Sequence, residues 1–532
     1  MNSGGTHASA YWGESFQVSD QDIEHLINLL IEGETPLSTE EMARALVERR
    51  LRLETERRQR EEKTSARLYL PQDTYQVGEE VTFPGLEYAV GTVQAVRPGR
   101  NPDIGSFEVL QVEFGPGRRR EFAAGLSDHR LNAPPELGMN GGAGEQTPEE
   151  ILHEHGSAVV ARLGARLQKS ADLVRIAGRW FPSALLVKIH AGHLNLAEAA
   201  LDVAGGGPLP TSDLLTHLDL PQDINSKLLS FSVDYSLQED ERFDEVGPAG
   251  QVLWHLRRLE PEAVVHPPER LVYTPVPHDE RVLTPELRKL EGELDDEASP
   301  ERGAAPAEAQ DEVVVVLTYP HFRQGTLPLS SKLASLFPTA YEAPRIRFIL
   351  VDGLTGEKFP GWVVRTHRFV SGLADWYKKH DVVAGAYVAV RSGEQPGEVI
   401  VQAQHRRPIS EWVRTATASE PRGLTFSLKR RPVRVNYDEH MMVIVEDIAA
   451  VDAAWWKTAE RNAPLPQLVA GLFRELAKLN PQSAVHARAL YSAVNVIRRC
   501  PPGPIFAELG ARPYYVHVGD LYWRFDESRW GA

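Results

Sequence analysis

Apolar residues in the N-terminal part of the chain recur with the spacing of an α-helix. Between residues 20 and 62 they lie three or four positions apart, as Leu26 and Leu30 do, which places them on one helix face. The tetrad Ser-Thr-Glu-Glu at 38–41 has the form of a capping box that opens a second helix. The pattern therefore predicts two helices joined by a short turn within 15–65.

The hydrophobic spacing changes after this helical region. Between residues 76 and 125, short β-type runs are separated by Gly and Pro, which is typical of small all-β units. The pattern is similar to that of small SH3-like or Tudor-like β-barrels and predicts one at 70–132. Three consecutive arginines at 118–120 follow a hairpin turn, and they fit either phosphate contacts or a β-edge protected by charge.

A stretch in the second half of the chain, 359–393, combines strand patterns with a basic turn. A strand-like run at 362–364 leads into Arg-Thr-His-Arg at 365–368. A helix-length piece at 373–377 and a β-branched run at 382–390 follow. The pattern predicts a donor-rich turn held between strands, an arrangement that can present side chains to a groove of nucleic acid.

The residues before this stretch continue the β-rich pattern. A strand run at 313–317 precedes a polar loop at 319–325, and 327–338 reads as a strand and a helix closed by proline. Apolar residues alternate over 345–351. Asp-Gly-Leu-Thr-Gly at 352–356 predicts a turn, because Gly adopts positive φ and Asp bonds its own backbone.

The order of these pieces resembles the B-three DNA-binding pseudobarrel, a fold of plant transcription factors and of recognition domains in some type II restriction endonucleases. The resemblance covers 311–404 within a predicted domain at 311–413. It departs from the family at Ala386, where the family usually has Asp. The residues that carry it are the run 313–317, Leu327, Pro328, Ala334, Phe337, Pro338, Ile346, Asp352, Gly356, Trp362, Arg365, Arg368, Leu373, Trp376, Tyr377, Gly385 and Val388.

In that family two arms read the bases, so the resemblance implies DNA-binding arms at 319–325 and 365–369. Arg323, Arg365 and Arg368 are then expected to contact bases, because the planar guanidinium matches guanine O6 and N7. The alternative is a protein-interaction barrel whose arginines are solvated surface charges. The remaining predicted DNA-binding residues are Tyr319, His321, Gln324, Thr366 and His367 on the arms, and Lys378, Lys379 and Arg391 on the backbone phosphates.

A second resemblance lies at 192–260. Three helical segments precede two strand runs, Arg-Phe-Asp-Glu-Val-Gly at 242–247 and Gln-Val-Leu-Trp at 251–254. This order resembles the HARE-HTH group of winged helices, and residues 463–532 show a further winged-helix pattern. Because the segment is acidic and its third helix carries only Lys227, it fits packing on protein as well as it fits DNA.

The predicted fold class is α+β multidomain, with winged-helix units, a small SH3-like β-barrel and a B-three-like pseudobarrel. A chain of 532 residues is expected to form about three to five domains. The predicted units are a helix-turn-helix-like segment at 15–65, the small barrel at 70–132, a helical connector at 148–191, the winged helix at 192–260, an acidic disordered linker at 285–312, the B-three-like barrel at 311–413, a β extension at 420–460 and a winged-helix-like unit at 463–532.

The net charge of −16 opposes phosphate binding, but the charge is segregated. Residues 313–413 hold 12 Lys and Arg against 8 Asp and Glu, whereas 285–312 hold 3 against 10. The predicted barrel is therefore basic, and part of the acidity lies in the linker.

The sequence predicts no catalytic residue, no cofactor and no metal site. The single cysteine, Cys500, excludes an intrachain disulfide and a Cys-based zinc finger, and the N-terminus lacks a secretory signal pattern, so a cytoplasmic location is expected. No phosphate-binding glycine loop or nucleophile elbow is present. Asp352 with Glu357 and Lys358 imitates a nuclease magnesium motif, but its spacing is short and its Asp-Gly turn belongs to the barrel pattern.

These observations favour a sequence-specific, non-enzymatic protein that binds double-stranded DNA. It would act in transcription regulation or as the recognition subunit of a restriction or defence system, with DNA and possible further protein subunits as partners and no membrane contact. The alternatives are a multidomain protein-interaction scaffold and, lower, a nuclease with an unrecognised catalytic domain.

Overall fold

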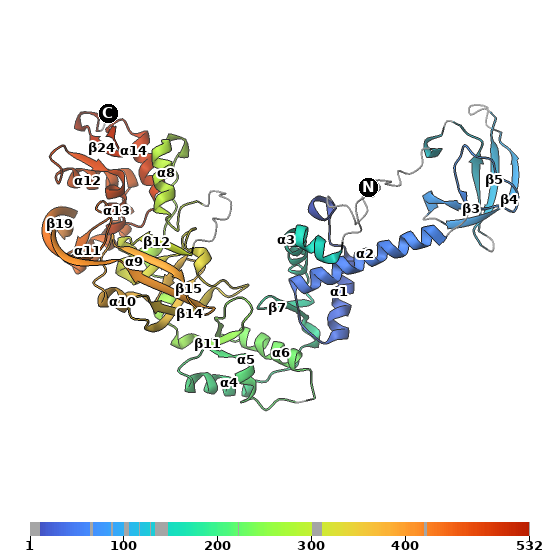
Figure 1. Cartoon of the computed structure of the whole chain (residues 1–532), viewed down its shortest axis with the longest axis horizontal. Helices are drawn as coiled ribbons and strands as arrows, with labels where there is room; N and C mark the ends of the chain where they lie inside the picture. Colours follow the sequence, from blue (N-terminus) through green and yellow to red (C-terminus); the bar gives the residue numbers. More distant parts are fainter. Residues whose placement is uncertain are drawn as a thin grey trace. The chain divides into compact units, whose positions relative to one another are not determined.

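The structure is a computed structural model that describes residues 11–63, 67–86, 89–100, 106–115, 118–127, 129–132, 147–221, 223–300, 311–419 and 423–530. The chain is a mixed α+β protein with several sheets (Figure 1). Two compact units divide it near residue 185, with 176–178 grouped with the second unit. Each unit is described separately below.

The first unit begins with helices that bury one apolar face. Leu26, Leu30 and Leu46 are fully buried, as the predicted helical spacing requires. The predicted capping box is present, since the Ser38 side chain accepts from the Glu41 amide at 3.1 Å and Glu41 accepts from the Ser38 amide at 2.7 Å. The elements are η1 (Tyr11–Ser15), α1 (Asp20–Gly33), α2 (Thr39–Lys63), α3 (Pro148–Leu167) and the small sheet of β1 (Leu37–Ser38), β8 (Arg179–Pro182) and β7 (Leu173–Ile176), followed by η4 (Ser183–Leu185).

The same unit contains a five-stranded sheet around a small aromatic core. Val81, Phe83 and Val112 are buried in it, and neighbouring strands are antiparallel except for the first pair. Residues 133–146 lie outside the described part of the chain. The strands, in sheet order, are β2 (Arg67–Leu68), β3 (Glu80–Phe83), β4 (Ala89–Pro98), β5 (Glu108–Glu113) and β6 (Arg119–Ala124), with η2 (Pro84–Leu86) and η3 (Arg130–Asn132) between and after them.

The second unit opens with three helices packed on a three-stranded sheet. Its core holds Leu201, Leu214 and Trp254, all with no exposed surface. The Trp254 indole donates to Asp234 at 2.9 Å, and burial raises the pKa of that carboxyl to about 6. The elements are α4 (Ala191–Val203), α5 (Thr211–Leu215), α6 (Ser226–Gln238) and the sheet β10 (Phe243–Glu245), β11 (Leu253–Leu256), β9 (Leu209–Pro210).

The prediction of a disordered acidic linker at 285–312 is wrong for residues 285–300. Pro285–Leu294 form helix α8, capped by Thr284, and Leu287 and Leu290 pack into the core of the C-terminal region. The acidic residues that follow α8 are buried in ion pairs rather than solvated. This burial orders a segment whose acidic composition is typical of disorder. Residues 301–310 lie outside the described part. Shorter helices that precede α8 are η5 (Arg257–Leu259), α7 (Glu262–Val265), η6 (Glu269–Leu271) and η7 (Glu280–Val282).

A curled seven-stranded sheet follows, and it has the form of half a barrel (Figure 1). Val388, Val401 and Leu350 fill its concave core. Its order is β12-β17-β18-β14-β15-β16-β13, so β12 and β13 are its edges and the described strands form an open sheet rather than a closed barrel. The elements are β12 (Glu312–Val316), α9 (Tyr319–Gln324), β13 (Thr326–Pro328), η8 (Ala334–Leu336), β14 (Arg345–Asp352), β15 (Lys358–Val364), β16 (Phe369–Ser371), α10 (Ala374–Lys379), β17 (Tyr387–Ser392) and β18 (Glu398–Ala403).

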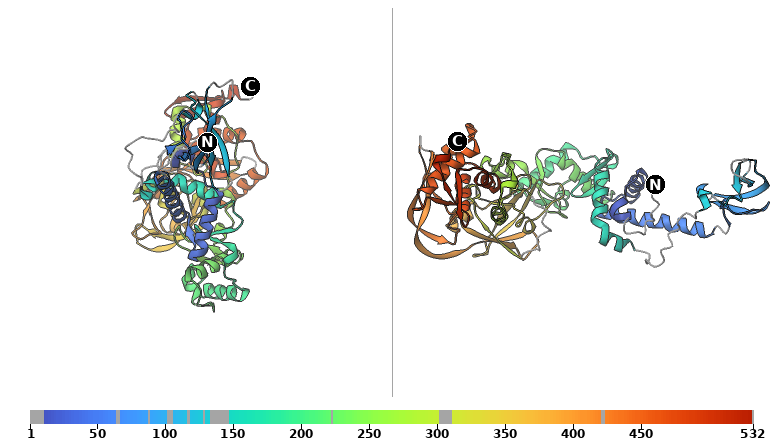
Figure 2. Two further views of the ribbon diagram at one scale, coloured as in Figure 1. Left: turned by 90° about the vertical axis from the view of Figure 1, so that its right-hand side faces the viewer. Right: turned by 90° about the horizontal axis from the view of Figure 1, so that it is seen from above.

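A long two-stranded ribbon leads from this sheet into the C-terminal helices. Figure 2 (right) shows the orange ribbon of β19 and β20 curving around the red C-terminal helices. The predicted β extension at 420–460 is wrong at its end, because 448–460 form helix α11. The elements are β19 (His405–Ser419), β20 (Gly423–Val435), β21 (Ile444–Val445), α11 (Ile448–Glu460), α12 (Leu465–Ala477), β22 (Ala484–His486), α13 (Ala487–Ile497), α14 (Pro502–Ala511), β23 (Tyr515–Gly519), β24 (Tyr522–Phe525) and η9 (Glu527–Arg529).

Among the helices that the structure describes, none is both long enough and apolar enough to cross a membrane.

Candidate functional site

The first predicted DNA-binding arm is helix α9 rather than a loop, and two of its predicted contacts are buried. Tyr319 is 3% exposed and His321 is 1% exposed. The His321 ring lies between Thr326, 2.9 Å from Nδ1, and Glu297, 3.1 Å from Nε2. Both side chains belong to the core, so their prediction as DNA contacts is wrong.

The other two predicted residues of this arm reach the surface. Arg323 and Gln324 are half-buried, and Arg323 donates to Asp452 at 2.9 Å. The end of α9 abuts the start of α10, because the Leu373 amide donates to the Gly325 carbonyl. The structure thereby brings Arg323 and Lys378 to one cavity of about 650 Å³, which Arg434 of β20 also lines.

The second predicted arm is the turn between β15 and β16. Thr366 and His367 are exposed, whereas Arg365 is half-buried and donates to the Ala343 carbonyl at 2.8 Å. Arg368 has a φ of 53°, a left-handed conformation at the end of the turn.

The two predicted arms lie at opposite ends of one short ladder. Strand β13 pairs with β16 so that Thr326, next to α9, faces Ser371. At the other end Pro328 faces Phe369, next to the turn. The arms are therefore separated by the three-residue length of the ladder, about 7–10 Å of strand.

Of the predicted phosphate contacts, Arg391 is exposed near the end of β17, while the two lysines of α10 are paired. Lys378 contacts Asp375 at 3.0 Å, and Lys379 contacts Asp352 at 3.0 Å and Glu357 at 2.7 Å. The lysine side chains of these ion pairs are exposed to solvent, so the pairs are weak and a phosphate can compete with the carboxylates for the lysines.

The Asp352 carboxylate is saturated by hydrogen bonds. It accepts from the Leu354 amide, the Thr355 hydroxyl, Lys379 and the His380 ring at 2.6–3.0 Å. Burial alone would raise its pKa, but these bonds outweigh burial and hold the pKa well below its ordinary value. The donors fix a turn and occupy the oxygens that the nuclease motif would offer to magnesium.

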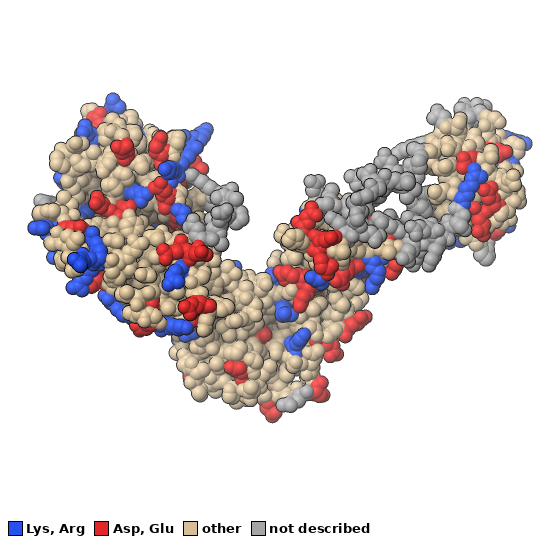
Figure 3. All heavy atoms as spheres, in the orientation of Figure 1, with Lys and Arg blue, Asp and Glu red and all other residues tan. Residues whose placement is uncertain are grey.

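The ribbon of β19 and β20 carries exposed cations that are not among the predicted DNA-binding residues. We call it the basic ribbon, and its cations gather on one edge of the second unit in Figure 3. Trp412, 65% exposed, faces Arg430 across the strands. The run Lys-Arg-Arg-Pro-Val-Arg at 429–434 is the local signal for this surface, but its partners on β19 lie up to 24 positions away in the chain. Its exposed cations are Arg407, Lys429, Arg430, Arg431 and Arg434.

Two carboxylates partly neutralise this ribbon. Glu446 contacts Lys429 and Arg431, each at 2.5 Å, and Asp381 contacts Arg434 at 3.1 Å. For Arg430 the structure records only a backbone acceptor, Ser410, at 3.4 Å. Arg430, opposite Trp412, and Arg407 are thus the two exposed ribbon cations that no described carboxylate holds.

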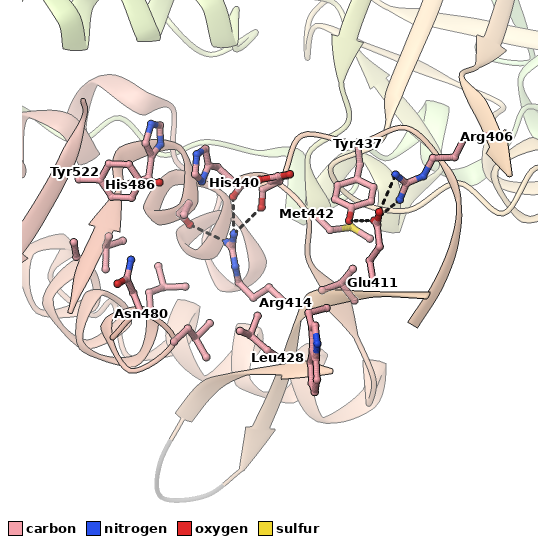
Figure 4. A pocket seen from close by; sticks show the side chains of 18 residues that line it. Arg406, Glu411, Arg414, Leu428, Tyr437, His440, Met442, Asn480, His486 and Tyr522 are labelled. Atoms are coloured by element: carbon pink, nitrogen blue, oxygen red, sulfur yellow. Dashed lines mark hydrogen bonds and ion pairs between the residues drawn. The ribbon is translucent and has the colours of Figure 1, made fainter. Parts of the chain in front are cut away.

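A polar cavity of about 580 Å³ lies between the basic ribbon and the C-terminal helices (Figure 4). We call it the ribbon cavity. On its ribbon side Glu411 is held by Arg406 and by the Tyr437 hydroxyl, each at 2.5 Å. Its lining residues are Arg406, Glu411, Trp412, Val413, Arg414, Leu428, Tyr437, Glu439, His440, Met442, Leu476, Leu479, Asn480, Ala484, Val485, His486, Ala489 and Tyr522.

Two histidine rings stack in the wall of the ribbon cavity. His440 and His486 lie with ring centroids 3.9 Å apart and planes 4° apart, and Tyr522 meets the His486 ring edge-on at 5.0 Å. Burial lowers the pKa of both imidazoles, and that of His486 falls to about 4. Both rings are therefore neutral at pH 7 and present aromatic faces rather than charge.

Arg414 stands between the two sides of the cavity (Figure 4). Its guanidinium donates to three carbonyls, those of His440 at 2.9 Å, Glu439 at 3.3 Å and Ala489 at 3.5 Å. Burial lowers the pKa of Arg414 to about 10, so the guanidinium is still charged at neutral pH. Its hydrogen bonds go to carbonyls, and no carboxylate among the described residues contacts it.

Neither a metal centre nor a reactive thiol emerges from the described residues. They contain no group of three or more His, Cys, Asp or Glu side chains placed to hold a metal ion. Cys500 is buried, and burial raises the pKa of its thiol to about 12. Comparison of the chain with known protein families, with characterised proteins and with solved structures found no match.

Proposed function

We propose that the chain is a sequence-specific, non-enzymatic protein that binds double-stranded DNA through its second unit. The observation that carries this proposal is the basic ribbon, a two-stranded surface with five exposed cations and the exposed ring of Trp412. Two-stranded ribbons of this kind fit into the grooves of a duplex. Arginine supplies both phosphate contacts and bidentate contacts to guanine.

The curled seven-stranded sheet supports the proposal through its second arm. Thr366 and His367 are exposed on the turn after β15, and Arg368 ends the turn. In a B-three-like pseudobarrel this turn reads bases. The first arm is reduced to Arg323 and Gln324, since the other two predicted contacts are buried.

The cavity shared by α9, α10 and β20 extends the basic surface. Arg323, Lys378 and Arg434 converge on it from three elements. Each is paired with one exposed or half-exposed carboxylate, so binding a phosphate exchanges a weak contact for a stronger charge-assisted one. If α4–α6 and β9–β11 act as a winged helix that packs on protein, they position this surface without contacting DNA.

The decisive experiment is selection of bound DNA from a random pool with the full chain, followed by affinity measurement on the enriched site. Arg430→Ala should weaken binding about tenfold or more, because it removes an exposed ribbon cation that no described carboxylate holds. Lys289→Ala is the matched control, since Lys289 is an exposed cation on α8, away from the ribbon in sequence. A pool that shows no enrichment and no binding at low salt would reject the proposal.

A second candidate function is a protein-interaction scaffold within a larger assembly. It is favoured by the apolar side chains that the basic ribbon exposes, namely Ile409, Trp412 and Leu428. Exposed large apolar groups on one strand pair are typical of a protein contact. The DNA selection separates the two candidates, because a scaffold would return no enriched sequence.

A further inference from the structure

The ribbon cavity combines two features that recognise a nucleotide, which are a guanidinium that no described carboxylate contacts and aromatic faces. Its volume of about 580 Å³ falls within the range of small-ligand sites. We propose that it binds a single nucleotide, with the phosphate on Arg414 and the base against the paired rings of His440 and His486. The nucleotide is either a free monophosphate or one residue of a nucleic-acid strand.

The phosphate end is defined by Arg414. Three recorded bonds use three of its five N–H groups, and two of those bonds are 3.3 Å and 3.5 Å long. The remaining donors, on Nε and Nη1, have no acceptor among the described residues. A half-buried cation whose hydrogen bonds all go to carbonyls gains from an anion, and a phosphate oxygen supplies charge and acceptors together.

The other charged groups that line the cavity neither repel this anion strongly nor compete with Arg414 for it. Glu411 is already balanced by Arg406 and the Tyr437 hydroxyl. Glu439 is exposed, so solvent screens its repulsion. Both histidines are neutral and add no competing cation.

The base end is defined by aromatic rings. His440 and His486 form a double layer, Tyr522 is edge-on to it, and Tyr437 and Trp412 line the ribbon side. Stacking of a base on such rings contributes about 1–3 kcal/mol by alanine substitution. The Asn480 oxygen accepts from the Gln482 amide at 2.8 Å, which orients its amide group at the wall where a base edge can bond.

The position of the cavity suggests how a strand could reach it. Trp412 belongs both to the exposed surface of the basic ribbon and to the cavity lining. A nucleotide extruded from bound DNA, or a strand end, could therefore enter from the ribbon. This second source rests on the proposed DNA-binding function, whereas the free monophosphate does not.

The test titrates the full chain with deoxynucleoside monophosphates, with the matching nucleosides and with a short single-stranded oligonucleotide, by calorimetry. The monophosphate or the oligonucleotide should bind at least tenfold more tightly than the nucleoside. Arg414→Gln should remove that preference, and His440→Ala should lower affinity about tenfold or more for all three. Lys289→Ala, which removes an exposed cation of α8 that lines neither cavity, is the control and should change nothing for the monophosphate.

The two sources give different results. Tight monophosphate binding identifies a free nucleotide, whereas binding of the oligonucleotide alone identifies a strand residue. Equal affinity for nucleoside and monophosphate, or an Arg414→Gln variant that binds like the parent, overturns the proposal. If Arg414→Gln fails to fold, loss of binding in folded His440→Ala decides the question. Duplex binding that depends on Arg430 is measured separately, so failure of the DNA-binding function and failure of the cavity are distinguishable.

Discussion

His440 and His486 stack face to face with ring centroids 3.9 Å apart, and the second ring also caps a helix. The Nδ1 atom of His486 accepts from the Arg488 amide at 3.1 Å at the start of α13. An imidazole in this position cannot take up a proton on Nδ1 without losing the cap. The pair therefore couples the wall of the ribbon cavity to the protonation state of one ring.

We expect the free energy of unfolding to fall as the pH drops from 6.5 to 4. Burial lowers the pKa of His486 to about 4, so the unfolded chain binds a proton in this window and the folded chain does not. The loss should be about 1–2 kcal/mol after allowance for partial exposure of the ring. His486→Asn keeps a capping side chain and should flatten the pH dependence in urea titrations. An unchanged slope in this variant would contradict the assignment.

Stability should show the opposite pH dependence at Glu245. Burial raises the pKa of its carboxyl to about 8, against an ordinary value of 4.5. Between pH 4.5 and 8 the folded chain holds the proton that the unfolded chain has lost, so the free energy of unfolding falls as pH rises. Glu245→Gln keeps an acceptor for the Gly247 amide, now 2.9 Å from the carboxylate, and should remove this decline. Glu262→Gln, on exposed surface, is the control.

The buried ion pairs of Arg499 should be among the most sensitive features of the second unit. Arg499 contacts Asp296 at 2.6 Å and Glu297 at 2.6 Å, with all three side chains under 8% exposed. Arg499→Met leaves two buried carboxylates and should cost about 3–5 kcal/mol. Arg512→Met breaks only an exposed pair with Glu508 and should cost less than about 1 kcal/mol. Urea unfolding compares the two, and equal losses would show that the buried cluster is not structural.

DNA binding should weaken with salt in proportion to the phosphates contacted. With about 4–6 contacts, a rise from 50 to 200 mM salt should reduce affinity on the order of a hundredfold or more. Glu446→Gln releases Lys429 and Arg431 and should strengthen binding several-fold at low salt. Affinity that is flat across this salt range would favour the scaffold function.

Sequence preference should depend on the second arm. Arg365→Ala and Arg368→Ala should relax the preference for the selected site, since one bidentate guanine contact contributes about 1–3 kcal/mol of discrimination. Lys378→Ala should weaken all sequences alike, because a lysine on phosphate carries no base information. Affinities for selected and random duplexes measure the difference. Equal losses on both duplexes would show that the arginines do not read bases.

The sequence by itself determined the elements whose signals are local. The capping box at 38–41 marks the start of α2, and the alternation over 345–351 marks β14. The turn at 352–356 follows from Asp and Gly, and its Asp352 oxygens accept from Leu354 and Thr355 as such a turn requires. In each case neighbouring residues supply the whole physical cause, so no knowledge of the rest of the chain is needed.

Some local signals were misleading because distant partners changed their meaning. His321 and the acidic residues near 296 read as exposed polar groups, yet in the folded chain they are buried and bonded to polar partners up to 203 positions away. The start of helix α14 contains Pro501, Pro502 and Pro504, residues that locally favour a loop, although proline is tolerated in a first helical turn.

The ribbon cavity was decided by tertiary structure alone. Arg414, His440 and His486 come from a strand, a loop and a helix start, and none of them has a sequence neighbour that indicates the others. The charge of Arg414 and the neutrality of the two rings follow from burial, which depends on how the basic ribbon packs on α12 and α13. Pairing and burial over such separations are properties of the folded chain, and a local pattern of residues does not contain them.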